Sequence, residues 1–145
     1  MSEPEQVTRE FFRRVALGDV DGVIELLSDQ IMWTVPGPPV IPYAGTFHGK
    51  AGVAEFFRIL FAHEDLQSFV PNEFIVDAAA GIVCVLGSET AVAIETGKRF
   101  TTKWTEIFRV SEGRITAFEE HIDTFALAEA YTPNNSPDRA SQAPA

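Results

Sequence analysis

Three glutamates fall in apolar, strand-like parts of the chain, where acids can carry out acid–base chemistry. Glu89, Glu106 and Glu120 lie in segments rich in Val, Ile, Phe and Thr. Carboxylic acids that lie close together in a partly dry cavity cannot all ionise, so the pKa of at least one should rise. An acid that stays neutral near pH 7 can donate a hydrogen bond to an oxyanion or transfer a proton. The pattern therefore favours a proton-transfer site.

Two hairpin turns decide which side chains share a face with these acids. The turns are predicted at residues 97–98 and 111–113, with Glu89 opposite Glu106 and Glu106 opposite Phe118. Because strand side chains alternate, this register places all three acids on the more apolar face. The predicted members of that face are Glu89, Ala91, Thr102, Trp104, Glu106, Phe108, Phe118, Glu120 and Ile122.

The opposite face is predicted to be polar, and this bears on the role of His121. Its expected members are Thr101, Lys103, Thr105, Arg109, Ala117, Glu119 and His121. On that face, His121 would be a surface or dimer-interface histidine rather than a general base. A one-residue change in either turn would send the acids to solvent instead, and they would then be ordinary surface residues.

Large aromatic residues are candidates for the wall of a ligand cavity. Trp104 would offer a flat apolar surface to a ring-shaped ligand, and Phe57 belongs to the apolar face of a predicted helix. Trp33 and Tyr43 flank a proline-rich loop and could line the entrance. Packing in an ordinary hydrophobic core explains each of these residues equally well.

Helical spacing and turn residues predict an α+β chain, with three helices first, long strands next and a short helix last. Ser2 and Glu5 form a capping-box pattern for the first helix, which should end at 18–19. Asp123 or Thr124 should cap the last helix. The other predicted segments are a helix through 23–27, a strand at 31–35, a long loop at 36–48, a helix after 49–50, strands at 69–77, 80–95, 99–110 and 114–122, and a helix at 125–131.

The composition indicates one domain with a real core. The chain has 145 residues, of which 46% are hydrophobic, and we expect a single domain at 1–131 followed by a disordered tail at 132–145. The net charge of −10 argues against binding to nucleic acid. The sequence suggests neither a secretory signal nor a membrane span, so a cytoplasmic location is expected. The histidines and the single cysteine, Cys84, have no spacing typical of a metal site.

Several short segments between residues 5 and 131 carry a family resemblance through their order and spacing. They are Gly18-Asp19-Val20-Asp21-Gly22, the strand around Trp33, Pro42-Tyr43-Ala44-Gly45 before His48-Gly49-Lys50, Trp104-Thr105-Glu106-Ile107-Phe108-Arg109-Val110, Glu112-Gly113-Arg114-Ile115 and Glu119-Glu120-His121-Ile122-Asp123-Thr124. Together they resemble the SnoaL-like branch of the nuclear transport factor 2-like superfamily. The resemblance implies a cone-shaped α+β barrel with a curved antiparallel sheet, a hydrophobic pocket, no cofactor and a homodimer joined across the sheet.

The resemblance also implies roles for individual residues. Glu106 matches the acid of ketosteroid isomerases that hydrogen-bonds the substrate oxyanion. Thr34 stands where those enzymes have a proton-shuttling carboxylate, so it is expected to contact the ligand. Glu89 and Glu120 match two catalytic carboxylates of limonene-epoxide hydrolases, but Gly87 replaces the arginine between them. The chain keeps the acids of these enzymes and lacks their known partners.

The residues and the resemblance together predict a cofactor-independent enzyme that acts on a hydrophobic, cyclic carbonyl compound. Proton abstraction next to the carbonyl would lead to isomerisation, cyclisation or dehydration. Glu120 would be the acid–base residue and Glu106 would stabilise the enolate oxygen, while Trp104, Phe118 and Phe57 would hold the ligand. The alternative is a non-catalytic or accessory module that binds an apolar or cationic ligand in the same pocket.

Overall fold

The computed structural model describes residues 1–134 and contains four helices and one six-stranded sheet. The predicted tail at 132–145 lies almost entirely outside the described residues. The elements in chain order are α1 (Glu3–Ala16), α2 (Val20–Glu25), β1 (Leu27–Val35), β2 (Gly45–His48), α3 (Gly49–His63), β3 (Glu64–Asp77), β4 (Ile82–Ala93), β5 (Lys98–Ser111), β6 (Arg114–Ile122) and α4 (Thr124–Tyr131). No helix in this part of the chain is long and apolar enough to cross a membrane.

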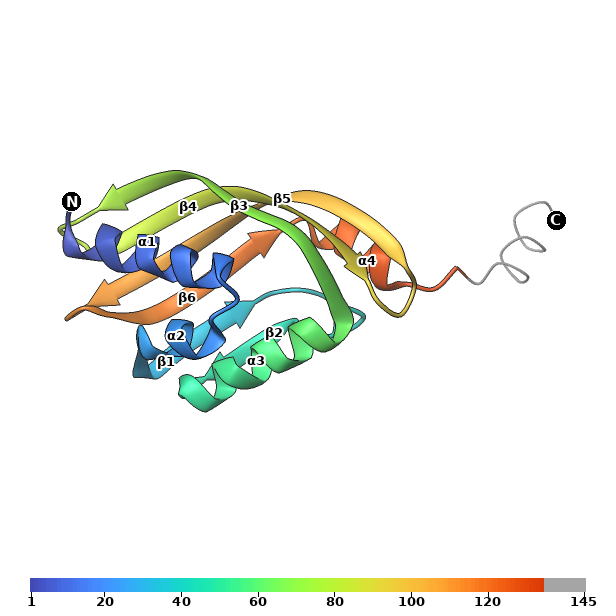
Figure 1. Ribbon diagram of the computed structural model, residues 1–145, viewed down its shortest axis with the longest axis horizontal. Coiled ribbons are helices and arrows are strands. Elements are labelled where there is room, and N and C mark those ends of the chain that lie inside the picture. The colour runs from blue at the N-terminus through green and yellow to red at the C-terminus, as the bar shows by residue number, and fades with distance from the viewer. Residues whose placement is uncertain (135–145) are drawn as a thin grey trace.

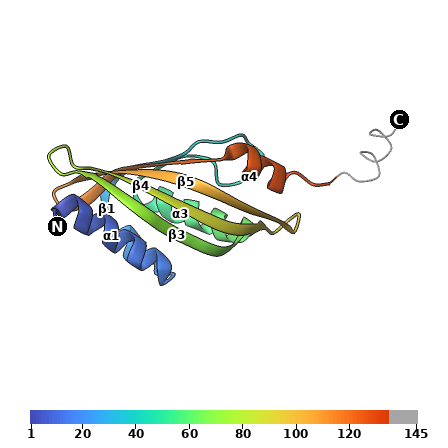
Figure 2. The same ribbon diagram turned by 90° about the horizontal axis from the view of Figure 1, so that it is seen from above.

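The sheet curves around the first three helices, which confirms the predicted α+β cone (Figures 1 and 2). Its strand order is β2-β1-β6-β5-β4-β3. All neighbouring strands are antiparallel, as predicted, except β1 and β6, which are parallel, so the sheet is mixed. Sequence patterns indicate hairpins between consecutive strands, but they contain no comparable signal for pairing between strands far apart in the chain.

The predicted helix caps are confirmed, whereas three strand assignments differ from the prediction. The Ser2 side chain accepts a hydrogen bond from the Glu5 backbone N–H, and the Asp123 side chain accepts one from the Ala126 backbone N–H. The first strand begins at Leu27, four residues before the predicted start at Ile31. The segment predicted as a long loop contains β2, because the chain turns back after its prolines and pairs with β1. Likewise, β3 begins directly at the end of α3 instead of five residues later.

The connection between β4 and β5 is longer than predicted. Four residues, 94–97, join the strands in place of the expected two-residue turn. Glu89 therefore lies opposite Thr102, and Glu106 lies opposite Val85. Because the register differs from the prediction by an even number of residues, every side chain keeps its predicted face.

A β-bulge in β6 restores the predicted face of Glu120. The turn before β6 has two residues, 112–113, with positive φ angles of 51° and 72°, and not the predicted three. One extra residue, Thr116, then shifts the register, so Glu106 lies opposite Glu120 and not opposite Phe118. Without this extra residue, alternation along β6 would turn the Glu120 side chain outward.

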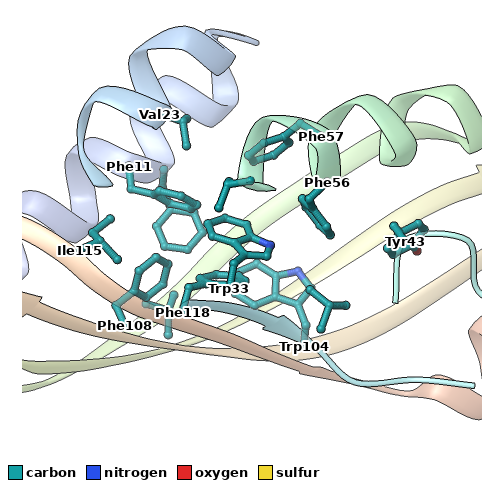
Figure 3. Close-up of a cluster of buried hydrophobic side chains, with 14 of the residues drawn as sticks. Phe11, Val23, Trp33, Tyr43, Phe56, Phe57, Trp104, Phe108, Ile115 and Phe118 are labelled. Carbon is teal, nitrogen blue, oxygen red and sulfur yellow. The ribbon is translucent and has the colours of Figure 1, made fainter. Parts of the chain in front are cut away.

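Aromatic rings fill the space between the helices and the sheet (Figure 3). Trp33 lies flat against Phe118, with ring centroids 3.8 Å apart. Phe108 is completely buried and meets Phe11 and Phe118 edge-on, at centroid distances of 4.9 and 5.2 Å. Such stacked and edge-on contacts add stability beyond the burial of area.

Gly87 leaves room for Trp104, and this gives a direct test of the packing. A Cβ atom at residue 87 would lie 2.2 Å from Cζ2 of Trp104 and 2.5 Å from the carbonyl oxygen of Val70. Gly87→Ala should therefore lower the free energy of unfolding by about 1–3 kcal/mol in urea denaturation. Ser88→Ala, at the adjacent half-buried position, should change it by less than about 0.5 kcal/mol. Equal stability of the two variants would contradict the observed packing.

Candidate functional site

A cavity lies between α1, α3 and the inner face of the sheet. The space inside it and at its mouth is about 550 Å³ with open solvent included, and the part that the centres of water-sized molecules can reach is about 60 Å³. Phe61 lines it and is 48% exposed, which places this residue at the opening. The lining residues are Phe11, Val15, Trp33, Tyr43, Phe56, Phe57, Leu60, Phe61, Glu64, Leu66, Phe69, Glu89, Glu106, Phe118 and Glu120.

Four glutamates line this otherwise apolar cavity, one from each of four neighbouring strands. Glu64 comes from β3, Glu89 from β4, Glu106 from β5 and Glu120 from β6. Their exposed fractions are 4%, 6%, 2% and 8%, so all four are buried. Among residues 1–134, none of those that line the cavity is Lys, Arg or His. Burial of so many acids without a basic partner opposes their ionisation.

Glu106 on β5 and Glu120 on β6 lie directly opposite each other and form a pair. Burial raises the pKa of Glu106 well above its ordinary value, and the hydrogen bond with Glu120 raises it further. Burial also raises the pKa of Glu120, although the hydrogen bond from Glu106 acts in the opposite direction. Glu106 is therefore the protonated partner and donates to Glu120. The Oε1 atom of Glu106 has no hydrogen-bond partner in the described part of the chain.

Glu64 belongs to a second polar cluster, with two tyrosines. The hydroxyl groups of Tyr43 and Tyr131 both donate to Oε1 of Glu64, at 2.6 and 3.3 Å. Burial raises the pKa of Glu64 to about 7, while the hydrogen bonds from the tyrosines act to lower it. Burial and the charge of Glu120 raise the pKa of Glu89 to about 9. The cavity thus combines protonated acids with one acid that is close to half ionised at neutral pH.

The three predicted acids all line the cavity, together with four of the six predicted ligand-contacting residues. These four are Trp33, Tyr43, Phe57 and Phe118. Trp104 is buried behind the wall, where it stacks on Phe69 with centroids 4.7 Å apart. The indole Nε1 atoms of Trp33 and Trp104 have no hydrogen-bond partner among the described residues.

Thr34 was predicted to contact the ligand, but the structure places it outside the cavity. Trp33 points inward, and alternation along β1 therefore turns Thr34 to the outer face of the sheet. There Thr34 pairs with Glu119 and lines a shallow outer groove. His121 also lies on the outer face, is half exposed and contacts Glu119, as expected for a surface histidine.

Glu64 is the one of the four cavity acids that the sequence analysis did not predict. The strand was expected to begin at Phe69, so Glu64 appeared to lie in a connection and carried no face assignment. The local sequence gives no signal of burial, because Glu64 lies between His63 and Asp65 at the end of α3. Its partner Tyr131 is 67 residues away in the chain, so only the folded structure reveals the cluster.

Comparisons with known proteins agree with this geometry. A cone of this kind with a cavity on its inner face defines an NTF2-like protein, and residues 8–118 match the model of the SnoaL-like domain. The chain therefore belongs to the SnoaL-like family. No curated protein matches it.

Several solved structures share the fold. An NTF2-like protein of Burkholderia xenovorans is 29% identical, with a TM-score of 0.80 over 90% of this chain and 96% of that one. An NTF2-like protein of unknown function from Burkholderia pseudomallei is 30% identical, with a TM-score of 0.81 over 91% and 99%. TerC, co-crystallised with polyporic acid, is 22% identical, with a TM-score of 0.78 over 90% and 98%.

The raised pKa values predict that the protein loses stability as the pH rises. In the unfolded chain a Glu loses its proton near pH 4.5, whereas in the folded protein Glu64 and Glu89 keep theirs to about 7 and about 9. The folded state therefore binds more protons, and raising the pH favours unfolding. Urea denaturation at pH 5, 7 and 9 should show a falling free energy of unfolding, and Glu89 alone should contribute on the order of 2 kcal/mol between pH 7 and 9.

Glu89→Gln should remove that part of the fall, because glutamine does not ionise. Glu73→Gln, at an exposed position of β3, serves as the control and should leave the pH dependence as in the wild type. Constant stability of the wild type from pH 5 to pH 9 would show that the buried acids are not held in their neutral form.

Proposed function

We propose that this protein is a cofactor-independent enzyme that transfers protons on a small hydrophobic carbonyl compound, leading to isomerisation, cyclisation or dehydration. The observation that carries the proposal is the buried pair formed by Glu106 and Glu120 inside an aromatic cavity. Desolvation of two opposed acids is costly, and a structural role alone would be served more cheaply by apolar residues. Perturbed acids in a cavity are typical of catalytic sites.

In the proposed mechanism the two acids of the pair have different tasks. Glu106, which holds the proton, turns its O–H group from Glu120 to the carbonyl oxygen of the ligand. Glu120 is then free to take a proton from the carbon next to that carbonyl. The electron pair of the broken C–H bond forms the C=C bond of an enolate, whose oxygen is stabilised by Glu106. A low-dielectric cavity strengthens this hydrogen bond.

The aromatic lining of the cavity favours a flat, apolar ligand. Phe57 from α3 and Trp33 and Phe118 from the sheet present ring faces and edges to the cavity, and Trp104 holds the wall from behind. The Trp33 Nε1 and Glu106 Oε1 atoms supply a donor and an acceptor that have no partner among the described residues. Unsatisfied buried polar atoms cost free energy until a ligand or water pairs with them.

Deuterium exchange of 2-tetralone in D₂O, followed by proton NMR, tests the proposed chemistry. This cyclic ketone has acidic C–H bonds next to its carbonyl, and the protein should accelerate their exchange. Glu120→Gln and Glu106→Gln should each slow the catalysed exchange by about a hundredfold or more, because each removes a proton-transfer or oxyanion-binding group. Binding of 2-naphthol, a planar analogue of the enol, should be retained when measured by fluorescence.

Glu119→Gln is the matched control, because Glu119 is adjacent on β6 but lies on the outer face. Its exchange rate should equal that of the wild type. Exchange that is unaffected in both Glu106→Gln and Glu120→Gln would eliminate the enzymatic proposal.

A second candidate function is supported by the lack of any basic side chain in the part of the cavity wall that the described residues form. Acids and aromatic rings together also suit a cationic amine, which would make the protein a binding module without catalytic activity. Tight binding of 1-naphthylmethylamine that weakens in Glu120→Gln, together with no exchange of 2-tetralone, would favour this candidate.

We also propose a homodimer joined across the outer face of the sheet. That face exposes Met32 and carries a shallow groove lined in part by Ile107 and Ala117, so it offers apolar surface for a second copy. Analytical ultracentrifugation at micromolar concentration should give twice the mass of one chain. Met32→Glu should shift the protein toward the monomer, and a wild-type monomer at these concentrations would contradict the proposal.

A further inference from the structure

We infer that Glu64, oriented by Tyr43 and Tyr131, is a second proton-transfer residue of the cavity and acts as a base on a carbon of the substrate. This inference rests on the proposed function and deepens it. It implies a substrate with an acidic C–H bond within reach of Glu64 while its carbonyl oxygen is held by the Glu106–Glu120 pair.

The geometry of the cluster leaves one carboxylate oxygen available. The Tyr43 hydroxyl donates to Oε1 of Glu64, and the single hydrogen of the Tyr131 hydroxyl is shared between that oxygen and the carbonyl oxygen of His63. No hydrogen bond occupies Oε2 among the described residues, although Glu64 lines the cavity and is only 4% exposed. The hydrogen bonds to Oε1 orient the carboxylate of Glu64 and leave its Oε2 atom available to accept a proton.

Three distant parts of the chain build this cluster. Glu64 is the first residue of β3, Tyr43 comes from the loop before β2, and Tyr131 is the last residue of α4. Tyr43 and Tyr131 also contact each other edge-on, with ring centroids 6.0 Å apart. Because Tyr131 belongs to α4, this short helix takes part in orienting Glu64.

The charges around Glu64 suit a base that works near neutral pH. The facing acids are Glu89 and Glu120, and the other facing groups are the two tyrosines. His63 and Glu95 pair with each other at the surface behind the cluster. Burial and the neighbouring acids oppose ionisation of Glu64, while the tyrosine donors favour it, and the resulting pKa is about 7. Burial raises the pKa of both tyrosines, so they remain neutral donors.

In the proposed step, Glu64 accepts one proton from the substrate and Glu106 donates another to it. The Glu64 carboxylate takes the proton from a carbon next to the carbonyl, on the side away from the carbon that Glu120 serves. The C–H electron pair then forms the C=C bond. The carbonyl π electrons move to its oxygen, which receives the proton of Glu106 and becomes an enol. Reversal of these transfers at a different carbon would complete an isomerisation, so Glu64 and Glu120 each serve a carbon and Glu106 serves the oxygen.

Glu64→Gln tests the inference in the 2-tetralone exchange assay. Glutamine keeps the shape of the side chain but cannot accept the proton, so the exchange rate should fall about a hundredfold. Asp65→Asn, at the adjacent exposed position of β3, is the control and should retain the wild-type rate. Thermal unfolding of both variants will show whether they are folded at the assay temperature.

Tyr131→Phe provides a readout that a merely structural role would not change. Tyr131 does not line the cavity, so this substitution removes a donor to Glu64 without removing a ligand contact. The wild-type exchange rate should rise with pH and level off above about 7, as Glu64 loses its proton. Loss of the donor raises the pKa of Glu64, so the variant should level off at a higher pH, with an exchange rate at pH 6 reduced up to about tenfold. Tyr43→Phe should shift the profile further, because its hydrogen bond is shorter.

The outcomes distinguish this inference from the proposed function. If Glu106→Gln loses exchange while Glu64→Gln keeps it and Tyr131→Phe has the wild-type pH profile, the role of Glu64 is wrong and the proposed function stands. If the wild type does not accelerate exchange at all, both are wrong. Loss of exchange in folded Glu64→Gln, together with the shifted profile of Tyr131→Phe, supports the inference.

Discussion

The burial of four carboxyl groups in one aromatic cavity is the constraint on which the rest of the structure depends. Every strand from β3 to β6 contributes one acid to the same inner face, and no basic side chain of the described residues in the cavity wall offsets them. The fold tolerates this arrangement because the acids can hold protons and share hydrogen bonds. Glu106 donates to Glu120, and Glu64 accepts from two tyrosines. The price is a dependence of stability on pH.

The same burial separates the acids into different chemical states. Glu106 is fully enclosed opposite another acid and keeps its proton, whereas Glu64 receives two hydroxyl donors and lies near the balance between its two forms. Identical side chains thus differ because their environments differ. An acid that donates and an acid that accepts, within one water-poor cavity, are the two parts that proton transfer on a carbonyl compound requires.

Much of the fold could be predicted from the sequence, because helix caps, helical spacing and strand alternation are local. The inner face of β4 to β6 was predicted correctly even though both turns were not. The register between β4 and β5 was wrong by an even number of residues, and in β6 the bulge at Thr116 compensated for the shorter turn. Glu120 points inward because of that bulge, which no residue pattern predicted. The correct face was therefore reached through an incorrect turn.

The sequence by itself determined the α+β class, the caps at Ser2 and Asp123, and the shared inward face of Glu89 and Glu106, because these depend on neighbours a few residues apart. Only the tertiary structure decided the parallel pairing of β1 with β6, the outward position of Thr34 and the cluster around Glu64. Each of these depends on contacts between segments that are distant in the chain. Such contacts form only when the sheet closes around the helices, and no local preference encodes them.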